Sequence, residues 1–396
     1  MNRGVLLGFL AALSVITFLD RLCIAVAGPR IQDELGIGPE RWGWVLGAFV
    51  LAYGLFEIPT GAMGDRSGHR RILTRIVLWW SAFTVLTGFA TGFAPLLITR
   101  FLFGAGEAGA YPNMAGVVSR WFPSEGRAAA QGYIWGASRA GGALAPLIVA
   151  PIQASYGWRT SFFVFGFLGV LWCAAWWLWY RDPAPSASVH AAPWKELAAS
   201  PRVRTIVVMY GCYAWGSWFY FSWLHTYLVK GRGFSEAQMA VFSSLPFALG
   251  ALANVAGGYL SDFACRRLGP RRGRTIVGSV CLTISACLLV ATATTPSSNA
   301  AVVFLTAGFG VMDLMLPSAW ALCLDIGGRH AGAVSGAMNT AGQFGGFLCT
   351  IIFGYVVGQW GDYNLPLFVI AAMLCIAAAL FQRIDASQPL FHETSP

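Results

Sequence analysis

Long apolar stretches alternate with short polar connectors along nearly the whole chain. Each apolar stretch is about twenty residues long, enough to cross a bilayer as a helix, and lacks the period-two alternation of a membrane β-strand. These stretches cover residues 5–29, 42–63, 73–93, 95–118, 128–151, 160–180, 204–227, 237–259, 275–294, 300–322, 332–357 and 363–383. The pattern predicts an all-α membrane protein with twelve transmembrane helices.

The longest polar connector divides the predicted helices into two groups of six. It covers residues 181–203, is rich in proline and serine, and predicts a cytoplasmic linker between an N-terminal half, 1–180, and a C-terminal half, 204–396, with a short cytoplasmic tail. The halves also repeat, because residues 61–66 and 258–263 close corresponding spans with a similar Gly-to-Asp pattern. Two related halves are typical of transporters whose binding site lies between the repeats.

Composition and charge agree with a membrane protein. Hydrophobic residues make up 57% of the chain and charged residues 11%, whereas soluble domains carry about 25% charged residues. The net charge of +9 comes from basic residues in the connectors, so we expect no nucleic-acid partner. With both termini on one side, that side holds eighteen of the 26 basic residues, the other holds five, and three lie inside spans. The positive-inside rule therefore predicts cytoplasmic termini.

The chain carries no motif of a soluble enzyme. There is no P-loop, no HExxH segment and no recognisable Ser/His/Asp set, and the nine cysteines include no CxxC pair. We therefore expect neither an enzyme nor a bound metal or cofactor. A membrane enzyme or receptor would not explain the six-plus-six repeat. The glycine pairs Gly132–Gly136, Gly342–Gly346 and Gly354–Gly358 predict close helix packing.

Seven Asp, Glu and Arg side chains fall inside the predicted spans, away from the span ends. An ionisable group is costly within a bilayer unless it is paired or hydrated, so each one is a candidate for function. They are Asp20, Arg21, Glu57, Arg100, Glu107, Arg139 and Asp313. The near balance of acids and bases predicts internal pairing, with one carboxylate able to take up a proton.

Asp20 and Arg21 are adjacent, and neighbouring residues on a helix point about 100° apart, so the two should have different partners. Arg21 presents a planar fork of donors that suits a substrate carboxylate. Asp20 would face the fourth span, where Arg100 and Glu107 lie two helical turns apart. We therefore expect Asp20 and Glu107 to carry the coupling proton, through competition between the substrate and a carboxylate for the Arg21 guanidinium.

The other intramembrane charges allow more than one interpretation. Arg100 and Asp313 are assigned to gating or structural pairing, with a direct role in substrate contact or coupling left open. Arg139 lies two residues before Gly141, where small side chains allow a close approach. It either supplies a second guanidinium, which would suit a dicarboxylate or an acid with extra oxygens, or pairs with Glu107 or Asp313.

One connector resembles a known family pattern. The segment reads Gly61-x-x-x-Asp65-Arg66-x-Gly68-x-Arg70-Arg71. It is similar to the loop 2–3 signature of the major facilitator superfamily and lies between the second and third predicted spans, where that signature belongs. His69 replaces the usual Arg or Lys. The resemblance implies a gating role for Asp65, Arg66 and Arg70, and we expect Asp65 to pair with Arg127 at the start of the fifth span.

Further motifs resemble a narrower group. They are residues 18–21, 100–112, 120–127, 223–228 and 335–346. These segments are similar to the anion:cation symporter family, which includes bacterial proton-coupled sugar-acid permeases and the vesicular glutamate and sialic acid carriers. His225 replaces a proline expected in the seventh span, which puts the local kink there in question.

The resemblance implies a secondary transporter in the bacterial inner membrane that moves a small organic anion, such as a hexonate, hexuronate or glucarate, together with protons. Positions matching Tyr53, Trp320 and Asn339 help to hold the polyol in that family, beside the carboxylate partner Arg21. We expect a monomer. The alternative is an organic-anion or sugar-phosphate exchanger without net proton coupling, which is disfavoured because the seventh span has no arginine apart from Arg204 at its cytoplasmic start.

Overall fold

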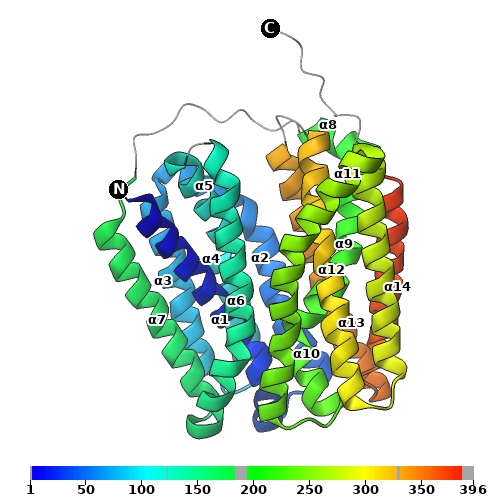
Figure 1. Ribbon diagram of the computed structural model, residues 1–396. Coiled ribbons are helices and arrows are strands. Elements are labelled where there is room, and N and C mark those ends of the chain that lie inside the picture. The colour runs from blue at the N-terminus through cyan, green and yellow to red at the C-terminus, as the bar shows by residue number, and fades with distance from the viewer. Residues whose placement is uncertain (1, 123, 183–193, 328–330, 386–396) are drawn as a thin grey trace. The chain divides into compact units, whose positions relative to one another are not determined.

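The computed structural model describes residues 2–122, 124–182, 194–327 and 331–385, and in these ranges the secondary structure is helical without any strand (Figure 1). The first seven helices are α1 (Arg3–Leu35), α2 (Pro39–Ser67), α3 (His69–Gly88), α4 (Phe93–Glu107), α5 (Ala110–Trp121), α6 (Ser124–Tyr156) and α7 (Trp158–Trp179). The remainder are α8 (Trp194–Ala199), α9 (Pro201–Ser222), α10 (Leu224–Thr226), the π-helix η1 (Tyr227–Gly231), α11 (Glu236–Thr294), α12 (Ser298–Gly327), α13 (Ala331–Trp360) and α14 (Leu365–Gln382). The all-α prediction is confirmed.

Eight helical segments among the described residues are long and apolar enough to cross a membrane. They are Arg3–Leu35, Pro39–Gly61, Trp158–Trp179, Glu236–Gly269, Arg271–Thr294, Ser298–Gly327, Ala333–Trp360 and Leu365–Gln382. Two of these segments, Glu236–Gly269 and Arg271–Thr294, lie within α11, which is interrupted at Gly269, where φ is 79° and ψ is 161°. The other four predicted spans coincide with α3, α4–α5, α6 and α9–α10. The total of twelve spans stays a prediction.

The chain groups into two compact units by its internal contacts. Unit 1 consists of residues 1–186, 221–245 and 350–361, and unit 2 consists of residues 187–220, 246–349 and 362–396. The candidate charged residues of the first, second, fourth and fifth spans all belong to unit 1. The predicted division at the linker 181–203 stays a prediction, and residues 183–193 of that linker lie outside the described ranges.

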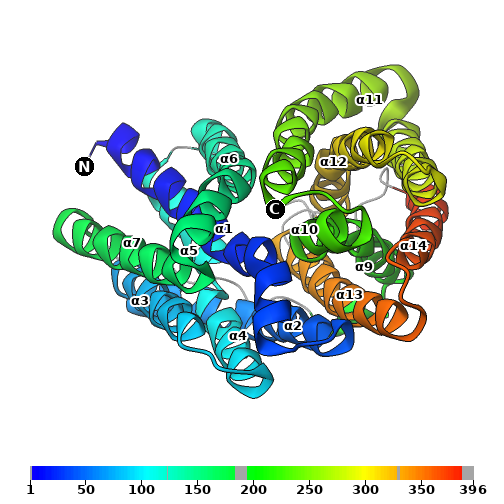
Figure 2. The ribbon, with the colours of Figure 1, turned by 90° about the horizontal axis from the view of Figure 1, so that it is seen from below.

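Unit 1 is built from pairs of closely packed helices. In Figure 2, α1 lies along α6, while α3 packs between α7 and α4, and α2 packs on α4. Small residues allow the closest approaches. A Cβ added at Gly141 of α6 would stand 2.8 Å from the carbonyl oxygen of Val15 in α1, and one added at Gly104 of α4 would stand 2.4 Å from that of Phe49 in α2. Backbone therefore meets backbone in both pairs.

The predicted fourth span is two helices, because the chain breaks directly after Glu107. Ala108 adopts φ −53° and ψ 135°, and Gly109 has a positive φ of 88°. The break is held by side chains of neighbouring helices: the Thr60 hydroxyl donates to the Ala108 carbonyl at 2.7 Å, and the Asn113 amide donates to the Gly109 carbonyl at 2.8 Å. The free backbone groups at the end of α4 are thus partly satisfied within protein, as an interruption at membrane depth requires.

We expect Gly109→Ala to destabilise the protein strongly. An L-residue at this positive φ costs about 1–2 kcal/mol, and the new Cβ would stand 2.4 Å from Thr60 Oγ1 and 2.8 Å from Thr60 Cβ, which adds roughly 1–3 kcal/mol of overpacking. Thermal unfolding of the purified protein in detergent should show the loss. Gly132→Ala is the matched control, since no described atom lies within 4 Å of its added Cβ. Equal unfolding temperatures for the two variants would contradict this role of Gly109.

The seventh predicted span is also interrupted, although it has no proline. α9 ends at Ser222, Trp223 leaves ideal helix geometry with φ −102° and ψ −17°, and a short helix and the π-helix η1 follow. The Trp223 indole donates to the Thr350 carbonyl at 3.0 Å. The kink that the replacement of proline by His225 had put in question is therefore present, around Trp223, and His225 itself is fully buried.

Unit 2 uses the same small-residue packing. A Cβ added at Gly345 of α13 would stand 2.1 Å from the Gly211 carbonyl oxygen of α9, and one added at Gly257 of α11 would stand 2.2 Å from that of Leu314 in α12. Gly278 of α11 lies against the ring of Phe381 in α14. Glycines thus set the helix separations within this unit.

Candidate functional site

An ion pair between Arg21 of α1 and Glu107 of α4 lies inside unit 1. The Arg21 Nε donates to Glu107 Oε1 at 3.0 Å, and an Nη atom of the same guanidinium donates to that oxygen as well. The Glu107 side chain is fully buried, while 13% of the Arg21 side chain is exposed. The second Glu107 oxygen, Oε2, has no hydrogen-bond partner among the described residues. The pair is therefore buried on the acid side and accessible only at the guanidinium.

Three aromatic rings surround the Arg21 guanidinium. Its carbon lies 5.3 Å from the ring centre of Phe18, 5.2 Å from that of Phe49 and 5.0 Å from that of Tyr53. Cation–π attraction at these distances contributes about 0.5–2 kcal/mol each, more where water is excluded. The rings therefore stabilise the positive charge of Arg21 where burial has removed water from it. Tyr53 is placed by this contact beside Arg21.

Asp20 and Arg100 lie in the same buried region without forming a direct pair. Asp20 is 1% exposed and neither of its carboxylate oxygens has a hydrogen-bond partner in the described part of the chain. Arg100 is 2% exposed and lies over the rings of Phe49 and Phe103, at 5.0 and 4.4 Å. Asp20 is close enough to feel the charges of both Glu107 and Arg100. Asp20 of α1 thus lies near the two charged side chains of α4.

The four charges make a site that can exchange one ion pair for another. Burying an ionised carboxylate or guanidinium is costly, and removing one partner of a buried pair leaves an uncompensated charge. A proton on Glu107 would remove the negative charge facing Arg21, and an anion would supply a new one. Arg21 is therefore the cation of this cluster whose carboxylate partner an anion can replace.

Arg139 lies on α6, next to the α1 surface that carries Phe18. Its guanidinium carbon is 5.7 Å from the ring centre of Phe221, a residue of unit 1. The Glu107 carboxylate pairs with Arg21, and both sequence-based interpretations of Arg139, a second guanidinium for the substrate or a partner for Glu107 or Asp313, stay predictions.

The predicted site residues of the second half belong to unit 2. Asp313 of α12 is fully buried, and its Oδ2 would stand 2.8 Å from a Cβ added at Gly250 of α11. Trp320 of α12 and Asn339 of α13 are both partly exposed. Their proposed roles are not tested by the structure of this unit.

The loop after α2 is fixed by an acid that the sequence motifs do not include. Asp182 accepts hydrogen bonds from the backbone N–H groups of His69, at 2.9 Å, and Arg70, at 3.2 Å, and so caps the start of α3. The Arg70 guanidinium donates to the Trp177 carbonyl and lies 4.1 Å from the Trp177 ring centre. The His69 ring is buried against Asn113, with Nδ1 3.0 Å from Asn113 Oδ1. Position 69 therefore holds a buried imidazole where the family pattern has Arg or Lys.

The predicted pairing of Asp65 with Arg127 falls outside the described part of the structure. The side chains of Asp65, Arg66 and Arg127 are not described, so their gating role stays a prediction.

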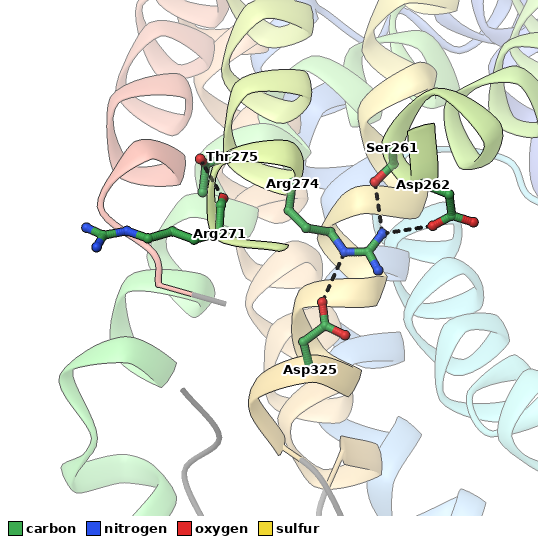
Figure 3. Close-up of polar contacts among 6 residues, drawn as sticks. All are labelled: Ser261, Asp262, Arg271, Arg274, Thr275 and Asp325. Carbon is green, nitrogen blue, oxygen red and sulfur yellow. Dashed lines mark hydrogen bonds and ion pairs between the residues drawn. The ribbon is translucent and has the colours of Figure 1, made fainter. Parts of the chain in front are cut away.

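The corresponding charge cluster of unit 2 is well defined (Figure 3). Arg274 donates from Nε to Asp325 at 3.0 Å, and from Nη1 to the Ser261 hydroxyl at 2.9 Å and to Asp262 at 3.4 Å. Arg274 therefore joins the two parts of α11 to the end of α12. Sequence reasoning placed Asp262 in the repeat but missed Arg274 and Asp325, for which the only signal was a base and an acid at the ends of neighbouring spans.

Comparison with known proteins finds proteins named as transporters that are similar to this chain over almost its whole length. A protein of Cupriavidus necator named "Probable sulfoacetate transporter SauU" is 33% identical over 100% of this chain and 96% of its own length. A hexuronate transporter of Bacillus subtilis is 29% identical over 94% of this chain and 92% of its own. A D-galactonate transporter of Escherichia coli is also 29% identical, over 92% of this chain and 91% of its own.

A solved structure shows the same fold. The bacterial homologue of the human lysosomal transporter Spinster superposes with a TM-score of 0.84 over 96% of both chains, at 21% identity. The model of the Major Facilitator Superfamily matches residues 10–350. Together with the helical architecture and its apolar spans, this match shows an integral membrane transporter and not an enzyme: the chain belongs to the Major Facilitator Superfamily.

Proposed function

We propose that the protein is a proton-coupled symporter that works by alternating access. Its substrate is a small organic anion, with a sugar acid as the leading candidate. The observation that carries the proposal is the buried ion pair between Arg21 and Glu107, open only on the arginine side. The names of three relatives, which refer to sulfoacetate, hexuronate and D-galactonate, support an anionic substrate. In all three compounds an acidic group is available for a guanidinium.

Coupling follows from competition for Arg21. A proton taken up by Glu107, or by Asp20 beside it, frees the guanidinium for the substrate carboxylate. When the anion leaves on the other side, loss of the proton restores the internal pair and resets the empty carrier. The proton is then the coupling ion, and no long-range relay is needed.

The other predicted residues take supporting roles in this scheme. Tyr53 contacts the Arg21 guanidinium, while Trp320 and Asn339 are assigned to the polyol part of a sugar acid. Arg100, Asp313, Asp65, Arg66, Arg70 and Arg127 are assigned to gating or structural charge. We also propose a monomer in the bacterial inner membrane with both termini cytoplasmic, on the basis of the charge distribution.

Uptake into liposomes tests the function. The purified protein should accumulate labelled D-galactonate, glucuronate or sulfoacetate above its external concentration when the outside is acidic, and a protonophore should abolish the accumulation. An exchanger would instead require the anion or another acid inside the vesicles and would ignore the pH gradient. That second result would replace symport by exchange, and no uptake under either condition would exclude these anions.

A further inference from the structure

Two arginines of unit 1 flank a pair of aromatic rings. The Arg21 guanidinium lies against Phe18, the Arg139 guanidinium lies against Phe221, and the two rings meet edge to face with centres 5.9 Å apart and planes inclined by 73°. The order of contacts is therefore guanidinium, ring, ring, guanidinium. Each ring of this edge-to-face pair thus contacts one guanidinium group.

A second set of contacts leads from Arg21, by another path, to the helix that carries Arg139. The Tyr111 hydroxyl of α5 is 3.0 Å from the Ser14 hydroxyl of α1, and its ring stacks on Trp135 of α6 with centres 4.6 Å apart. Tyr111 is also close enough to interact with Arg21 and with Ser138, the residue before Arg139. Polar groups therefore lie on the second path as well.

The separation of the two arginines is fixed by helix packing. Gly141, two residues after Arg139, lies directly on α1: its added Cβ would stand 3.0 Å from Val15 Cα and 3.1 Å from Phe18 Cβ. α6 therefore packs closely, at Gly141, on the helix that carries Arg21. Both guanidinium-bearing side chains retain some exposure, 13% for Arg21 and an intermediate fraction for Arg139.

We propose that the transported anion carries two acidic groups, one bound by Arg21 and the other by Arg139, with the carbon chain between them beside the partly exposed ring of Phe221. This inference rests on the proposed function and narrows its substrate to diacids, either dicarboxylates or sulfonated carboxylates. Each guanidinium can bind one acidic group through two parallel hydrogen bonds. A monoacid would use Arg21 alone, so the second acidic group is what Arg139 adds to affinity.

Matched pairs of acids test the substrate class directly. Galactarate and galactonate have the same six carbons and differ only in whether the last one is a carboxylate; glucarate with gluconate, and sulfoacetate with acetate, are further pairs. Binding to the full-length protein in nanodiscs is measured by calorimetry. We expect the wild type to bind one or more of the diacids at least about tenfold more tightly than its monoacid partner, the effect of one charge-assisted contact.

The variant Arg139→Gln connects the preference to this residue. It should weaken diacid binding by about tenfold or more and change monoacid binding by less than about twofold. Arg139→Lys keeps the charge but loses the fork and should fall between. Arg41→Gln is the control for loss of one positive charge, since Arg41 is exposed and lies over Phe93, away from the rings.

The outcomes separate the inference from the function on which it rests. Equal affinity of the wild type for monoacid and diacid, or equal weakening of both by Arg139→Gln, would overturn the diacid assignment and leave an anion transporter in place. Should Arg139→Gln not fold, the wild-type preference and Arg139→Lys still decide. If none of the six acids binds, the proposed function fails and the inference fails with it.

Discussion

Glu107→Gln should abolish accumulation of substrate against its gradient while retaining exchange of substrate across the membrane. Glutamine matches the shape of a protonated glutamate and cannot release a proton. The guanidinium of Arg21 would then remain available for the anion on both sides. Counterflow of labelled substrate in liposomes should stay within a few-fold of wild type, whereas uptake driven by an acidic outside should disappear.

A matched control separates this effect from loss of any acid in an ion pair. Glu34 also pairs with an arginine, Arg159, but its side chain is 47% exposed. Glu34→Gln should therefore leave uphill uptake intact. Asp20→Asn should resemble Glu107→Gln or weaken transport more broadly through the adjacent Arg21. Accumulation by Glu107→Gln and Asp20→Asn with unaltered pH dependence would remove both carboxylates from coupling.

Arg21→Lys should lose substrate binding even though it keeps the positive charge. Lysine is a compact point charge without the planar fork, so it forms one of the two parallel bonds to a carboxylate and fits the three rings less closely. Loss of a hydrogen bond to a charged group costs about 1.5–3 kcal/mol, which corresponds to roughly tenfold to hundredfold weaker binding. Calorimetry with the best-binding acid measures the change directly.

The control for this substitution lies on the same helix. Arg30 of α1 pairs with Glu236 at 2.5 Å and donates to the Gln153 carbonyl at 2.7 Å. Arg30→Lys should leave binding within about threefold of wild type, because it does not touch the ring-lined site. Near-normal affinity of Arg21→Lys would exclude Arg21 as the bidentate anion partner.

The fold was largely predictable because hydrophobic length dominates in a membrane. Runs of about twenty apolar residues located the helices, and the loop motif with its neighbours indicated the superfamily. Breaks inside spans were harder to foresee. The interruption after Glu107 involves Thr60 of α2 and Asn113 in the first turn of α5, and composition alone does not show such partners.

The site was predictable as a set of residues but not as a set of contacts. The seven intramembrane charges stood out because each is costly in lipid, whereas the rings of Phe49 and Phe221 were indistinguishable from other apolar residues. The glycine pairs in the sequence likewise did not reveal which of them make close contacts. Gly342 and Gly346 lie against Tyr210 and Trp218, but Gly132 and Gly136 have no described atom within 4 Å of an added Cβ.

The two backbone approaches of unit 1 have a mechanical consequence. α1 packs closely on α6 at Gly141, and α2 packs closely on α4 at Gly104, so each pair is held by contacts between the two backbones. The hydrogen bond between Arg21 and Glu107 connects the α1–α6 pair to the α2–α4 pair. Neutralising Glu107 would therefore loosen the seam between the pairs while leaving each pair assembled. Protonation of a single carboxylate would then weaken the contact between the two helix pairs.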